Sequence, residues 1–291
     1  MNTVELLKKV RKIEIKTRGL SSQMFSGGYH SAFKGRGMSF SEVREYQYGD
    51  DIRNIDWNVT ARFNHPYIKI FEEERELVVM LLIDVSRSSF FGTQTQFKSE
   101  IITEICAVLS FSAINNNDKV GVIFFSDQIE KFIPPKKGKT HILRIIRELL
   151  DFKPEHRKTN IGQALKYFQN VMKKRSIAFL ISDFIDDSYY DNLRIVANKH
   201  DLVGIHLYDV REYDLPNIGL IRGRDPETGR VEWIDTSSKK TRVKYKAGFL
   251  ENQETMNSVF TKAGADLVSI DTRESYINAL LRLFRKRQSR R

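Results

Sequence analysis

The sequence has one cysteine, Cys106, among its 291 residues, so the chain can form no internal disulfide and has no cysteine pair for zinc. Its six histidines are scattered and show no His-x-x-x-His spacing, which removes the other common zinc signature. No apolar run approaches the roughly 20 residues that a membrane-spanning helix needs, and the N-terminus lacks the apolar core of a signal peptide. We therefore expect a cytoplasmic globular protein with an ordinary hydrophobic core.

Two signatures of nucleotide-binding enzymes are incomplete. Gly138-Lys139-Thr140 matches the end of a phosphate-binding loop, but Ile133 stands where the first glycine is required. Gly35-Arg36-Gly37 begins a dinucleotide fingerprint, but Phe40 replaces its third glycine. Neither segment supports a nucleotide-dependent reaction.

The formal net charge of +11 is concentrated at the two ends of the chain. Residues 282–291 hold six Arg or Lys and no acid, and residues 1–20 hold six basic and two acidic residues, which leaves the rest of the chain at +1. A basic stripe across the folded body is absent from this pattern, and no RNA- or DNA-binding motif accompanies it, so we expect no nucleic-acid partner. We expect residues 282–291 to form a basic tail. Basic ends of this kind can make peripheral contact with anionic lipid headgroups or with an acidic partner.

Short apolar runs, rich in β-branched residues, alternate with segments of helical periodicity. Helices are expected at residues 1–18, 96–114, 142–150, 161–172 and from 274 onward. Strands are expected at residues 77–83, 120–125, 128–133, 176–182, 202–207 and 265–270, with a hairpin insertion near 219–235. This alternation predicts an α/β fold with a doubly wound, mostly parallel sheet.

Oxygen-bearing side chains follow two of the buried strands. Asp84, Ser86 and Ser88 come directly after the strand at 77–83, and Asp183 follows the strand at 176–182. Thr159 precedes a predicted helix. Because ligands bind beyond the carboxyl ends of parallel strands, these side chains could share one crevice. All-oxygen ligands suit Mg²⁺, with Mn²⁺ or Ca²⁺ as alternatives, although Asp and Ser also cap helices, so capping remains open.

The ordered set formed by Asp84-x-Ser86-x-Ser88, Thr159 and Asp183 resembles the metal-ion-dependent adhesion site of von Willebrand factor A domains, and the similarity extends over about residues 77–271. The resemblance implies that the three hydroxyls contact the metal directly while the two carboxylates hold metal-bound waters. It also implies that an acidic residue of a partner protein fills the open coordination position.

A second resemblance concerns the segment before the first core strand. Residues 28–37 and 40–62 are similar to the signature of the bacterial family called domain of unknown function fifty-eight (DUF58). This resemblance implies an adaptor or chaperone-like role beside a MoxR-type AAA+ ATPase. The expected organisation is an N-terminal helix and signature segment over 1–76, a von Willebrand factor A-like domain over 77–281 and the basic tail.

The signature segment mixes arginines with acidic and apolar residues. We expect it to pack on the main domain as an ion-paired cap on the sheet, because Arg favours bidentate pairing with carboxylates in partly buried settings. A docking surface is the alternative.

A carboxylate at a strand end can also be a nucleophile in phosphoryl transfer. However, Ser86 stands where haloacid-dehalogenase-like sites carry a second Asp, the usual general acid. We therefore expect a binding module and not an enzyme. The alternative is a Mg²⁺-dependent phosphohydrolase that uses the same oxygen cluster.

Overall fold

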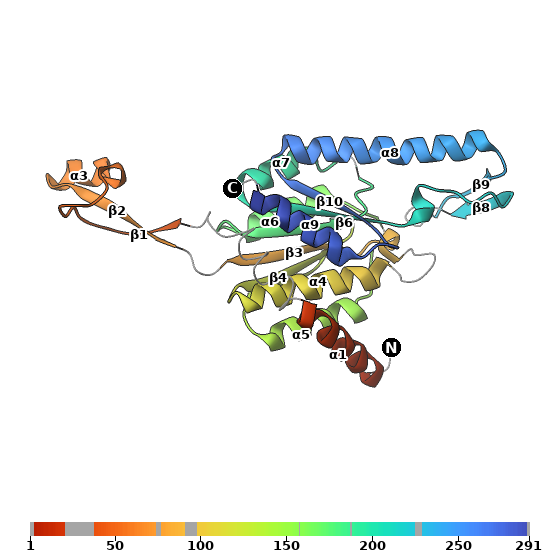
Figure 1. The fold of residues 1–291 in the computed structure, drawn as a ribbon, viewed down its shortest axis with the longest axis horizontal. Helices are drawn as coiled ribbons and strands as arrows, with labels where there is room; N and C mark the ends of the chain where they lie inside the picture. The colour runs from red at the N-terminus through yellow and green to blue at the C-terminus, as the bar shows by residue number, and fades with distance from the viewer. Residues whose placement is uncertain are drawn as a thin grey trace.

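The computed structural model describes residues 3–20, 38–73, 77–90, 98–156, 158–186, 188–224 and 229–289. Its centre is a six-stranded sheet in the order β10-β7-β6-β3-β4-β5 (Figure 1). The strands are β3 (Val78–Asp84), β4 (Lys119–Phe125), β5 (Ile129–Lys136), β6 (Ile177–Ser182), β7 (Asp201–Tyr208) and β10 (Asp266–Asp271). Only the β4–β5 pairing is antiparallel in this sheet. The predicted doubly wound, mostly parallel sheet is confirmed.

Helices cover both faces of the sheet. One face packs against α4 (Lys98–Asn115), α5 (Lys139–Asp151) and α9 (Tyr276–Ser289). The other packs against α6 (Ile161–Val171), α7 (Tyr190–Lys199) and α8 (Lys239–Lys262). Helix α1 (Thr3–Leu20) lies outside α4 and α5 and continues past Gly19, where the sequence predicted its end.

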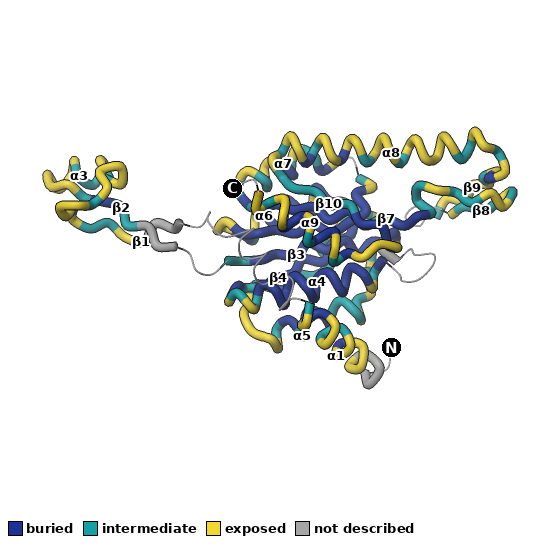
Figure 2. The backbone as a smooth tube through the Cα atoms, viewed as in Figure 1, coloured by how far each residue is buried: buried dark blue, intermediate teal, exposed yellow. Residues whose placement is uncertain are grey.

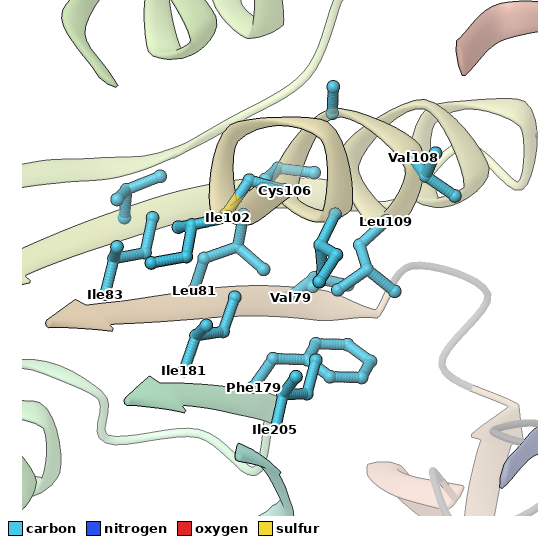
Figure 3. Packing of buried hydrophobic residues seen from close by; sticks show 14 of the residues in the cluster. Val79, Leu81, Ile83, Ile102, Cys106, Val108, Leu109, Phe179, Ile181 and Ile205 are labelled. Atoms are coloured by element: carbon cyan, nitrogen blue, oxygen red, sulfur yellow. The ribbon is translucent and has the colours of Figure 1, made fainter. Parts of the chain in front are cut away.

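The central strand β3 is buried on both faces because its side chains alternate between two cores. Val79, Leu81 and Ile83 point toward α4, where Figure 3 shows them beside Ile102, Cys106 and Leu109. Met80 and Leu82 belong to the opposite core. The apolar run that predicted this strand therefore contributes side chains to the hydrophobic cores on both faces of the sheet.

Helix α8 was not predicted, because only Met256 and Phe260 are buried along its 24 residues and no apolar stripe marks it. Its C-terminal part is fixed to the sheet at β7. A Cβ on Gly204 would lie 2.5 Å from the Phe260 ring, so a glycine is needed for this close approach. Before α8, β8 (Leu220–Arg224) and β9 (Val231–Asp235) pair as the predicted hairpin.

Residues 38–73 form an arm rather than the expected cap. Strands β1 (Met38–Glu45) and β2 (Tyr67–Glu73) pair with each other, and the 3₁₀ helix η2 (Ile52–Asn54) and α3 (Trp57–Phe63) lie between them in sequence. Figures 1 and 2 show this arm standing apart from the sheet, with exposed and intermediate residues along most of its described length. Residues 28–37 lie outside the described residues.

The physical reason is the small apolar content of the arm. Ile68 is its one buried residue among those with described side chains, whereas Trp57 and Phe63 are mostly exposed. The expected ion pairing is present, but it is internal, since Arg44 makes two hydrogen bonds to Asp50 at 2.8 and 2.7 Å. Arg44 and Asp50 therefore pair within the arm and not with the sheet.

The expected basic tail is also wrong over residues 282–289, which are the last turns of α9. Arg287 is nearly buried there and pairs with Asp201 at 2.5 Å and with Asp266 at 3.3 Å. These acids begin β7 and β10, so the charge anchors the helix. None of the described helices is long and apolar enough to cross a membrane.

Candidate metal centre

Asp84 ends β3 and ties that strand to its neighbours. Its Oδ1 accepts a hydrogen bond from the Ser86 backbone N–H at 2.9 Å, and its Oδ2 accepts one from the Ser182 hydroxyl at 2.6 Å. Ser182 is the last residue of β6, which lies beside β3 in the sheet. The Asp84 carboxylate therefore joins the loops that leave two adjacent strands.

Ser86 and Ser88 meet in the loop after β3. Both are buried, and their hydroxyl oxygens lie 2.9 Å apart. The short 3₁₀ helix η3 (Arg87–Phe90) begins between them. The predicted grouping of Asp84, Ser86 and Ser88 is thus present as a hydrogen-bonded unit.

Asp183 brings a second buried carboxylate to this end of the sheet. Its Oδ1 accepts a hydrogen bond from the Ile185 N–H at 3.3 Å. Its Oδ2 is buried and has no hydrogen-bond partner among the described residues. The Lys98 ammonium is 3.8 Å from this oxygen and forms a closer ion pair with Glu212. A buried carboxylate oxygen that accepts no hydrogen bond is costly, and a cation bound closer than Lys98 would satisfy it.

The two carboxylates affect each other electrostatically. Burial, followed by the negative charge of Asp183, raises the pKa of Asp84 to about 7, while hydrogen bonds from Ser182 and Ser86 oppose the shift. Like charges in one buried site disfavour double ionisation. A divalent cation would remove the repulsion between the two carboxylates. The negative charge of the site, as well as its oxygen atoms, therefore suits a bound metal ion.

Thr159 lies on the loop before α6, half-buried. The loop is held from both sides: the Asn160 N–H donates to the Ser126 carbonyl at 2.9 Å, and the Ile161 N–H donates to Asp186 Oδ2 at 2.8 Å. Ser126 follows β4 and Asp186 follows β6, so the Thr159 loop is fastened between the strands that flank β3.

Three contributors to this region were not predicted: Ser182, Lys98 and Glu212. Ser182 could have been predicted from the sequence, because it directly precedes Asp183 at the end of a predicted strand. Lys98 and Glu212 could not, since a buried ion pair between distant segments leaves no pattern in the sequence. Among the described residues, no group of three or more His, Cys, Asp or Glu side chains is placed to hold a metal. A metal here would therefore need hydroxyl ligands.

The sequence comparison decides the family. Residues 42–255 match the family described as "Protein of unknown function DUF58". The chain belongs to the DUF58 family. The match includes most of the arm and most of the sheet domain, so both are parts of the DUF58 sequence.

Relatives of this DUF58 protein include uncharacterized proteins of Mycobacterium bovis and Mycobacterium tuberculosis. Each is 24% identical over 287 residues, which cover 98% of this chain and 90% of the relative. Among solved structures, an aerotolerance-related membrane protein from Bacteroides fragilis is 14% identical, with a TM-score of 0.52 over 74% of this chain and 100% of that one. At this identity the likeness concerns the fold alone.

Proposed function

We propose that this DUF58 protein is a metal-dependent protein-interaction module. Asp84, Ser86, Ser88, Thr159 and Asp183 would hold Mg²⁺, with Mn²⁺ or Ca²⁺ as alternatives, and an acidic residue of a partner would complete the coordination. The observation that carries the proposal is the pair of buried carboxylates, one of which has an oxygen that accepts no hydrogen bond from the described residues.

The surrounding donors support this choice of metal and ligand. All are oxygens, which hard divalent cations prefer to the softer nitrogen and sulfur ligands of zinc or copper. Because hydroxyls are neutral, they compensate less of the metal charge than carboxylates would. A cation held this way supplies an electrophilic position that a partner carboxylate can fill.

The proposed partner is a MoxR-type AAA+ ATPase, and the proposed role is that of an adaptor or chaperone-like protein in the cytoplasm. The resemblance of the signature segment motivates this choice. The arm precedes Val78, at the end of β3 opposite Asp84 (Figure 1). A partner could therefore contact the arm and the metal loops independently.

A pull-down from cell extract tests this function. Wild-type protein and a variant combining Asp84→Ala with Ser86→Ala are each used with Mg²⁺ and with a chelator, and the captured proteins are identified by mass spectrometry. Asp151→Ala is the matched control, because Asp151 is exposed at the end of α5. A AAA+ ATPase retained by wild type and control only with Mg²⁺ supports the proposal. Equal retention by the double variant contradicts a metal-bridged contact.

A further inference from the structure

A cavity of about 900 Å³ lies beside the candidate metal centre. It is bordered by the residues that follow β6, by the start of α7 and by α8 from Lys240 to Met256. Its volume lies within the range of about 300–1,000 Å³ that is typical of ligand sites. Asp183 belongs to its wall, so the cavity and the metal loops share a residue.

About half of the residues that line the cavity are aromatic or aliphatic. Phe184 and Tyr189 lie on one side, with ring centroids 5.8 Å apart, and both are buried. Phe249 of α8 contributes the other side and packs against Tyr213 at 5.5 Å. These contacts fix the rings in place, and the wall can therefore receive an apolar group at little cost in reorganisation.

The cavity wall carries charges of both signs. Residues 239–246 of α8 contain four lysines and one arginine and no acid. Two of these, Lys240 and Lys244, line the cavity, and neither has an ion pair within the described part of the chain. Asp183, Asp186 and Glu212 also line the cavity, so the wall carries charges of both signs, and its apolar rings are what it offers an apolar group.

We propose that this cavity receives a large apolar side chain of the same partner segment whose carboxylate binds the metal. The proposal rests on the proposed function and specifies its partner: a peptide segment with an aromatic or large aliphatic residue next to its metal-binding Asp or Glu. Asp183 joins the two halves of the site. The metal would bind the carboxylate of the partner segment, and the cavity would bind the apolar side chain next to that carboxylate.

Gly248 provides a sharp test. It lines the cavity in the middle of α8, and a Cβ built on it meets nothing within 4 Å. Gly248→Leu should therefore reduce the cavity without a backbone clash, and replacing a mid-helix glycine favours the helix. Gly248→Ala is the matched control, since it makes the same helical change and leaves most of the space.

The experiment selects peptides from a library with a fixed central Asp and randomised flanking positions, using the full chain and Mg²⁺. Wild type and Gly248→Ala should enrich Phe, Tyr, Trp, Leu or Met beside the Asp by about ten-fold over Ser. Gly248→Leu should lose this enrichment while still binding Asp-centred peptides and Mg²⁺, the latter measured by calorimetry.

Each contrary outcome has a separate meaning. Peptide binding without apolar preference in wild type, or the same preference in Gly248→Leu, overturns the cavity proposal and leaves the proposed function standing. Mg²⁺ binding without any Asp-dependent peptide binding contradicts the proposed function and the cavity proposal with it. Self-association of the wild type that Gly248→Leu abolishes would assign the cavity to a second copy, which also overturns the peptide proposal.

Discussion

The Ser182 hydroxyl donates a 2.6 Å hydrogen bond to Asp84 Oδ2 across the boundary between β6 and β3. The same hydroxyl accepts a bond from the Phe184 N–H at 3.0 Å, so it holds the backbone on the far side of Asp183 as well. One serine thereby fixes the position of both carboxylates of the candidate metal centre.

We expect Ser182→Ala to lower the free energy of unfolding by about 1–3 kcal/mol, because it leaves the buried Asp84 oxygen without its donor. Urea denaturation in the presence of a chelator measures this loss. Mg²⁺ binding should weaken in the same variant. A variant with unchanged stability and unchanged Mg²⁺ affinity would show that the bond does not organise the site.

The raised pKa of Asp84 predicts a pH dependence with a definite sign. The folded-state pKa of about 7 is above the unfolded value near 3.8, so the folded metal-free protein binds the proton more tightly. This group's contribution to stability is therefore fully present below about pH 4 and is lost as pH rises to 7. Relative to Asp84→Asn, the metal-free wild type should lose stability over this window, measured by urea denaturation at several pH values. Parallel curves for the two proteins would contradict the assignment.

Lys98→Met should expose the role of the buried ammonium. The variant keeps a long side chain but leaves Glu212 and Asp183 without their buried cation, which should cost about 3–5 kcal/mol. Because Mg²⁺ can supply positive charge beside Asp183, we expect Mg²⁺ to raise the melting temperature of Lys98→Met more than that of wild type. Equal shifts in the two proteins would place the metal away from Asp183.

The separation of the arm from the sheet is testable by fluorescence. The two tryptophans are Trp57 in the arm and Trp233 in the hairpin, and their exposed fractions are 70% and 66%. In a Trp233→Phe variant, Trp57 is the sole tryptophan reporter, and iodide should quench it nearly as well as free tryptophan. Strong protection would mean that the arm packs on the main domain, as the sequence indicated.

The features that the sequence predicted correctly are those that depend on residues close together along the chain. Leu77 to Ile83 reads as a buried strand because every side chain in the run is apolar, and Asp84, Ser86 and Ser88 follow at a spacing that keeps them together. Helix α8 could not be predicted in this way, since only Met256 and Phe260 are buried along it and its apolar residues form no stripe. The sequence did not predict that the arm stands apart from the sheet. The physical reason is that the arm has few apolar residues to bury against the sheet. Arg287 stands in a stretch rich in Arg and Lys, which is typical of a solvated tail. Its ion pairs with Asp201 and Asp266, which are distant in sequence, hold the last helix against the sheet and could not be predicted.

Calorimetric titration of Mg²⁺ into the metal-free protein at pH 8 tests the central claim most directly, with wild type compared to Asp183→Asn. The substitution preserves the size of the side chain and removes the charge beside Asp84. We expect saturable binding of one Mg²⁺ per chain in the wild type and at least about a ten-fold weaker affinity in Asp183→Asn, as for loss of a metal-orienting carboxylate. No binding to the wild type, or equal affinities in the two proteins, would contradict a metal centre at these loops.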